Sequence, residues 1–104
     1  MKREEIQAGL YGKIIDTGYI YSKYVSWLEK HAYTYFRHFH DGQDPSEQEL
    51  ADEFIIVGHG EHGAYDNYLL AVQSVYDGNV YIVEKDGFKL TDQNNIEFTS
   101  CLPL

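Results

Sequence analysis

Histidine can act as an acid, a base or a metal ligand, and four of the five histidines of this sequence form two close pairs. The pairs are His38 with His40 and His59 with His62. Together with nearby carboxylates such as Asp41 and Glu47, they could bind zinc or a similar metal if the two segments met in space. Neither pair matches a tight motif such as H-E-x-x-H, and histidines near loops are more often surface residues. We therefore expect no metal site and keep metal binding as an alternative.

A glycine pattern surrounds the second pair. Residues 58–63 read Gly-His-Gly-Glu-His-Gly, a G-x-G-x-x-G pattern directly after a hydrophobic run. In dinucleotide-binding proteins this pattern places a helix N-terminus against a pyrophosphate. Against that interpretation, too few residues follow Glu84 to complete a doubly wound sheet, and Glu61 and Asp66 would repel phosphate. We expect a flexible connection ahead of a hairpin, keep nucleotide binding as an alternative, and leave open whether residues 64–76 form a strand or a helix.

Other signs of catalysis or of membrane insertion are missing from the sequence. Cys101 is the only cysteine, so the chain cannot form an intramolecular disulfide or a cysteine-rich zinc site. No G-x-S-x-G or Walker A motif occurs. No apolar run approaches the ~18 residues of a membrane span, and none follows the basic residues at the start. We expect a cytoplasmic protein that is not an enzyme and needs no cofactor.

Charge is the strongest functional signal, because no lysine or arginine lies between Arg37 and Lys85. The carboxylates of that stretch are Asp41, Asp44, Glu47, Glu49, Asp52, Glu53, Glu61, Asp66, Asp77 and Glu84, and the whole chain has a net charge of −9. Such a field repels nucleic acid and anionic membranes and steers basic proteins toward the surface. Solubility alone is the simpler explanation of the same acidity. We expect a basic protein partner and no direct contact with nucleic acid or membrane.

Helical signals dominate the N-terminal half. An apolar stripe at helical spacing predicts a helix over residues 16–37, although residues 33–36 and 19–21 are β-prone, so that the last turns could instead be extended. A shorter helix, ended by a glycine, is expected over residues 3–10. Asp44 as a cap, followed by a first-turn proline and Glu47 at the third position, predicts the start of another short helix.

Strand signals dominate the C-terminal half. Residues 54–57 read as a buried strand that Gly58 stops. Asp77-Gly78 lies between two apolar segments and predicts a hairpin that joins residues 68–76 with 79–84.

The same Asp-Gly device recurs once more before the chain ends. Asp86-Gly87 precedes residues 88–90, which suggests an antiparallel meander, while residues 94–102 fit either a short helix or an edge strand. We therefore expect one α+β domain over residues 1–104, with N-terminal helices packed on a mainly antiparallel sheet formed as a meander of hairpins.

We expect tyrosines and carboxylates to form a recognition surface for a protein partner. Most of the ten tyrosines should pack in the core or on the sheet, but tyrosine is also favoured at interfaces, and carboxylates around it would suit a partner rich in lysine and arginine. The partner-binding candidates are Asp41, Asp44, Glu47, Glu49, Asp52, Glu61, Tyr65, Asp66 and Tyr68.

From residue 54 onward the chain resembles a known family. The segments Phe54-Ile55-Ile56-Val57-Gly58, Asp77-Gly78-Asn79-Val80-Tyr81, Gly87-Phe88 and Asn95-Ile96-Glu97-Phe98 with Leu102 are similar in order to the C-terminal part of the SUKH superfamily of bacterial immunity proteins. The resemblance covers about half the chain. It implies an α+β fold that neutralises a toxin, often a nuclease, without a catalytic site, and it carries over no individual binding residue.

These observations predict a small acidic protein that inhibits a basic partner, with an immunity protein against a nuclease toxin as the leading form. A phage or plasmid encoded inhibitor of a host nuclease or defence complex, acting by nucleic-acid mimicry, is the second form. A metal- or nucleotide-binding protein that uses the histidine pairs or the glycine segment is the alternative from a different class.

Overall fold

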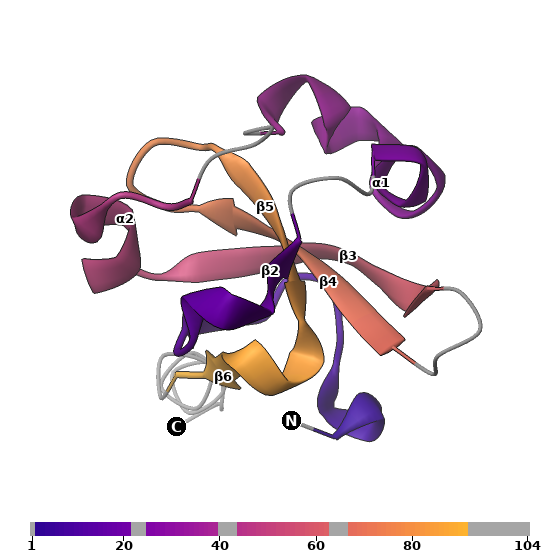
Figure 1. The fold of residues 1–104 in the computed structure, drawn as a ribbon, viewed down its shortest axis with the longest axis horizontal. Coiled ribbons are helices and arrows are strands. Elements are labelled where there is room, and N and C mark those ends of the chain that lie inside the picture. The colour runs from indigo at the N-terminus through magenta and orange to yellow at the C-terminus, as the bar shows by residue number, and fades with distance from the viewer. Residues whose placement is uncertain (1, 22–24, 40–43, 63–66, 92–104) are drawn as a thin grey trace, which may run out of the picture.

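The computed structural model describes residues 2–21, 25–39, 44–62 and 67–91 (Figure 1). The strands are β1 (Tyr11–Ile14), β2 (Ile20–Tyr21), β3 (Phe54–His62), β4 (Asn67–Ser74), β5 (Val80–Glu84) and β6 (Phe88–Leu90). The helices are α1 (Val25–His31) and α2 (Glu47–Ala51), and the 3-10 turns are η1 (Arg3–Glu5), η2 (Thr17–Tyr19), η3 (Tyr33–His38) and η5 (Lys85–Gly87).

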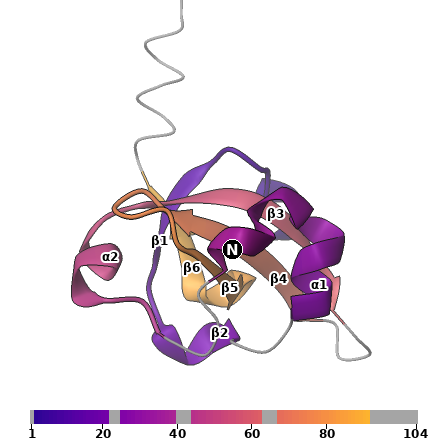
Figure 2. The same cartoon turned by 90° about the horizontal axis from the view of Figure 1, so that it is seen from above.

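The strands form one curled antiparallel sheet in the order β2-β5-β4-β3-β1-β6 (Figure 2). The expected α+β class is therefore confirmed in its coarse form, but strand outweighs helix. The finer expectation of N-terminal helices packed on the sheet does not describe the fold, because α1 has seven residues and α2 comes from the middle of the chain.

The sheet separates two hydrophobic cores, because successive side chains of a strand point to opposite faces. The inner core contains Ile6, Ile14, Phe54, Ile56, Leu70, Val72, Tyr81, Val83 and Phe88, with Leu50 of α2 packed against it. The outer core contains Trp27, Leu28 and Ala32 with Leu69, Ala71, Val80 and Ile82. Helix α1 and the residue after it therefore cover the outer face of β4 and β5, while α2 contacts the inner core.

The β4–β5 hairpin forms as predicted. Gly78 has a φ of +84°, a conformation that favours glycine, and β4 pairs with β5 in a register that sets Gln73 opposite Val80. Residues 67–74 are thus a strand, which settles the choice between strand and helix for that part of the 64–76 segment.

The expected meander ends at β5. The chain from Lys85 to Gly87 forms η5 rather than a hairpin turn, and β6 then pairs with β1. Gly87 permits this path because a Cβ atom there would lie 2.5 Å from the Cβ of Tyr19. A 3-10 turn and a crossover to the far edge of the sheet replace the second hairpin.

The long helix expected over residues 16–37 is wrong. Its first part forms η2 and β2, since Ile20 and Tyr21 pair with Val83 and Ile82 of β5. Of the described residues in this range, only 25–31 form an α-helix. Pairing of β-prone residues with an existing strand outweighs an apolar stripe at helical spacing. The helix expected over residues 3–10 is likewise reduced to η1.

Helix α2 begins two residues later than predicted. Its cap is Ser46, whose hydroxyl accepts a hydrogen bond from the Glu49 N–H, while the Glu49 carboxylate accepts one from the Ser46 N–H. This reciprocal capping box satisfies two backbone donors that the helix itself leaves unpaired. Asp44 therefore precedes the helix instead of capping it.

Candidate functional site

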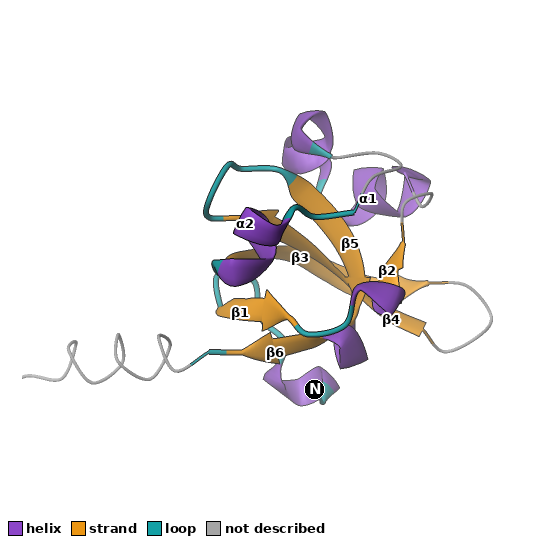
Figure 3. Cartoon of the chain, turned by 60° about the vertical axis from the view of Figure 1, so that its left-hand side comes forward, coloured by secondary structure: helices purple, strands orange, loops and turns teal. Residues whose placement is uncertain are grey.

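Four carboxylates, three of them exposed and Asp52 half-buried, gather where α2 meets the β4–β5 turn. We call this region the acidic end and define it by Asp44, Glu47, Asp52 and Asp77. Two contacts join its parts: the Val75 N–H donates to the Glu53 carbonyl at 3.0 Å, and Asn79 Nδ2 donates to Glu49 Oε2 at 3.5 Å. Figures 1 and 3 both place α2 beside this turn.

Two large apolar side chains are exposed on the turn of the acidic end. Val75 is 52 % exposed and Tyr76 is 58 % exposed, and both directly precede Asp77. Sequence reasoning missed them as candidates, because it selected Tyr65 and Tyr68 instead. The signal was available, since a residue that flanks an Asp-Gly turn has left the paired part of the hairpin. An exposed aromatic side chain among carboxylates is the arrangement that we expected at a recognition surface.

Glu49, in contrast, does not belong to that surface. Its side chain is 2 % exposed, and the Tyr81 hydroxyl donates to its two carboxylate oxygens at 2.8 and 2.7 Å. Together with the capping box, these contacts give the carboxylate a structural role beneath α2. We therefore leave Glu49 out of the proposed binding surface.

The buried Glu49 carboxylate makes stability depend on pH. Burial by itself raises the pKa of Glu49, but hydrogen bonds from the Ser46 N–H and the Tyr81 hydroxyl outweigh it, so that the pKa lies below the ordinary value of 4.5. Burial and the neighbouring Glu49 correspondingly raise the pKa of Tyr81.

A carboxyl with a lowered folded-state pKa stabilises the protein fully above its unfolded value, and this contribution is lost as the pH falls through the folded value. We predict that the wild-type melting temperature falls more steeply below about pH 4.5 than that of a Glu49→Gln variant. Melting curves followed by circular dichroism between pH 3 and 7 test this. Parallel pH profiles for the two proteins would contradict it.

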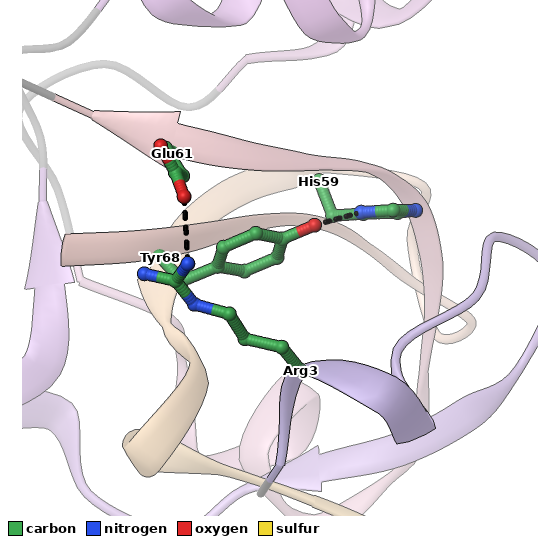
Figure 4. Close-up of polar contacts among 4 residues, drawn as sticks. All are labelled: Arg3, His59, Glu61 and Tyr68. Atoms are coloured by element: carbon green, nitrogen blue, oxygen red, sulfur yellow. Dashed lines mark hydrogen bonds and ion pairs between the residues drawn. The ribbon is translucent and has the colours of Figure 1, made fainter. Parts of the chain in front are cut away.

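A second polar cluster lies at the other end of β3 and joins four side chains (Figure 4). Arg3 forms an ion pair with Glu61 at 2.6 Å, and its guanidinium lies 4.9 Å from the centre of the Tyr68 ring. The Tyr68 hydroxyl is 2.6 Å from His59 Nδ1. The N-terminal segment is thereby tied to the β3–β4 hairpin by one charge pair and one cation–π contact.

This cluster changes the status of two predicted binding residues. Glu61 is already compensated by Arg3, and the Tyr68 ring packs partly against the inner core with its hydroxyl engaged by His59. Neither residue contributes to the acidic end. The candidates Asp41, Tyr65 and Asp66 lie outside the described residues.

The glycine pattern has a structural explanation in β3. The β3–β4 register shifts between Ile56 and Gly58, so that an extra residue moves the following side chains to the opposite face. Gly58 and Gly60 then lie under α1. A Cβ atom on Gly58 would be 2.6 Å from the His31 carbonyl oxygen, and one on Gly60 would be 2.4 Å from the His31 ring.

The expected flexible connection is therefore wrong for residues 58–62, which form strand. The nucleotide alternative lacks the helix that it requires after the glycine pattern, because β4 is the next described element after β3. The two glycines allow α1 to approach the sheet closely.

The histidine pairs do not come together in the described part of the chain. His38 is exposed at the end of η3, His59 and His62 lie on β3, and His40 is outside the described residues. Among the described residues, no group of three or more His, Cys, Asp or Glu side chains is arranged to hold a metal ion.

Comparison of the chain with protein-family models, curated proteins and solved structures finds no match. None of the described helices has the length and apolar character needed to cross a membrane.

Proposed function

We propose that this protein is a non-catalytic binding protein whose acidic end docks a basic protein. The observation that carries the proposal is the exposure of Tyr76 and Val75 on a turn bordered by carboxylates. Apolar and aromatic side chains supply most of the affinity of protein interfaces, while rim charges set the association rate and exclude wrong partners.

Among the described residues, none of the four carboxylates of the acidic end forms an ion pair, although Lys13 Nζ donates to the Ala51 carbonyl beside Asp52 at 3.2 Å. The ion pairs among the described residues are Arg3 with Glu61 and Lys85 with Asp86, and both lie away from the acidic end. Asp44 and Glu47 precede and open α2, and Asp77 lies on the adjoining turn. A partner rich in lysine and arginine would therefore meet several carboxylates at once.

Neutralisation of a nuclease toxin by an immunity protein is the leading form of this function, since a nuclease has a basic cleft for its substrate. Inhibition of a host nuclease or defence complex by a phage or plasmid encoded protein is the second form. Mimicry of a phosphate backbone by carboxylates on alternate strand positions has less support, because these carboxylates lie on a helix and a turn. Charge and shape complementarity centred on Tyr76 is the mechanism that we favour.

The test is a pull-down with the tagged protein from the native host at low and at moderate salt. The variant Asp44→Asn/Glu47→Gln/Asp77→Asn removes three charges from the acidic end while it keeps side-chain shape. We expect the captured basic partner to associate about tenfold more slowly with this variant and to lose much of its salt dependence.

Glu4→Gln/Glu5→Gln/Glu29→Gln is the matched control, because it removes three exposed charges from η1 and α1. It should bind at close to the wild-type rate. If both variants slow association equally, the effect comes from net charge and not from the acidic end. If the Asp44→Asn/Glu47→Gln/Asp77→Asn variant binds the partner as fast as the wild type, the interface lies elsewhere. Tyr76→Ala should then weaken binding by raising the dissociation rate.

A further inference from the structure

A small pocket lies between α1 and the end of β3. It has a volume of about 320 Å³ and is lined by Ser26, Trp27, Lys30, His31, Glu61 and His62. Hydrogen-bond donors dominate this lining, because it offers one hydroxyl, one ammonium, one indole and two imidazoles. In a chain with a net charge of −9, such a concentration of donors is unusual.

Glu61 is the only carboxylate among the described residues of the lining, and it is already compensated. Glu61 is held by Arg3 at 2.6 Å, so it leaves the Lys30 charge uncancelled in the pocket. Lys30 is exposed and forms no ion pair with any described residue. The acidic end is also far away, since Figures 1 and 2 place α2 and α1 on opposite sides of the molecule. Its field is largely screened at physiological salt over distances beyond ~8 Å.

An independent observation concerns Trp27. The residue is 5 % exposed, and its buried Nε1–H has no hydrogen-bond acceptor among the residues that the structure describes. A buried donor without an acceptor is rare in folded proteins and lowers stability. Trp27 lines the pocket, so an anionic oxygen bound there is a candidate acceptor for this N–H.

The neighbouring His31 is held firmly in place. Its ring lies 4.9 Å from the Trp27 ring and against Gly60, where a Cβ atom would be 2.4 Å from it. A fixed imidazole loses little conformational entropy when a ligand binds, which favours binding.

We propose that this pocket binds an oxyanion, the phosphate or carboxylate group of a small molecule. Lys30 supplies the permanent charge, Ser26 supplies a hydroxyl donor, and the imidazole of His31 supplies a ring N–H group. This site is separate from the acidic end, and its function does not depend on the proposed basic partner.

Binding should tighten as the pH falls. Burial, followed by the charges of Lys30 and His59, lowers the pKa of His31, so His31 is mostly neutral at pH 7. The other titratable groups around it are Glu61, paired with Arg3, and His62. An anion in the pocket favours the protonated form of His31, and protons and anion therefore bind cooperatively.

The test uses the single tryptophan of the chain. The indole N–H of Trp27 gives one resonance in a ¹H–¹⁵N spectrum of the full chain, which is titrated with sulfate at pH 6 and pH 8. Sulfate has the shape of phosphate and keeps its charge over this range, and chloride at equal ionic strength is the reference. Acetate in a parallel titration distinguishes a carboxylate site from a tetrahedral one. We expect a saturable shift with sulfate that is larger and occurs at lower concentration at pH 6.

Two lysine variants decide between a built site and a general charge effect. Lys30→Gln should weaken sulfate binding about fivefold. Lys89→Gln, which removes an exposed lysine on β6, should change it less than about twofold. An indole resonance that sulfate and acetate leave unmoved at both pH values would overturn the proposal. Equal weakening by the two variants would overturn it too.

Discussion

Replacing Glu49 with alanine should lower the free energy of unfolding by about 2 to 4 kcal/mol. The substitution removes both carboxylate acceptors of the buried Tyr81 hydroxyl beneath α2. It also removes half of the capping box, because the Ser46 N–H loses its acceptor. Urea denaturation followed by far-ultraviolet circular dichroism measures the change.

Glu47→Ala is the matched control, because Glu47 lies two residues away in the same short helix and is exposed. It should change stability by less than about 0.5 kcal/mol. Tyr81→Phe completes a double-mutant cycle, in which Glu49→Ala should have a smaller effect once the hydroxyl is gone. Additive effects of Glu49→Ala and Tyr81→Phe would mean that the pair does not stabilise the fold as a unit.

The contrast between Glu47 and Glu49 illustrates what the sequence predicts and where it stops. The residue pattern correctly predicts a short capped helix near residue 46, since capping depends on neighbours in the chain. It does not identify the buried glutamate, because the partner of Glu49 is Tyr81 on β5. A shift of two residues in the position of the cap exchanges the roles of the two glutamates.

The sheet follows the same division between local and long-range interactions. The β4–β5 hairpin is predictable because Asp77-Gly78 lies within the turn itself. The partner of β6 is not, since β6 pairs with β1 at the other end of the sequence. A search for local signals after β5 therefore predicts a hairpin where the chain crosses to the opposite edge.

The sequence predicts that the candidate site is acidic, but it does not predict where on the fold the site lies. The run of carboxylates without lysine or arginine indicates an acidic surface, and α2 with the β4–β5 turn provides one. The sequence could not indicate that Glu61 is compensated, because Arg3 lies 58 residues away. Tyr76 could have been selected from its place beside the Asp-Gly turn, whereas the packing of Tyr68 against the inner core depends on what covers the sheet.

Gly58→Ala is expected to lower the free energy of unfolding by about 2 to 3 kcal/mol. The new Cβ atom would be 2.6 Å from the His31 carbonyl oxygen and 3.0 Å from the Ala32 Cβ, so α1 has to move away from β3. Trp27 on α1 reports this movement directly, because its buried ring should become exposed and its fluorescence should shift to longer wavelength. Chemical denaturation measures the loss of stability in the same samples.

Gly18→Ala separates close packing from a general cost of replacing glycine. Gly18 has no positive φ, and the nearest atom to its added Cβ is the flexible Asp16 side chain at 3.1 Å. This control should change stability by less than about 1 kcal/mol and leave Trp27 fluorescence unchanged. If Gly58→Ala were as mild as Gly18→Ala, α1 would tolerate a larger separation from β3 than the structure has.

Because the glycines of β3 act through packing, NAD⁺ should raise the melting temperature of neither the wild type nor Gly58→Ala. A phosphate-binding loop would instead give a rise in melting temperature that the alanine removes.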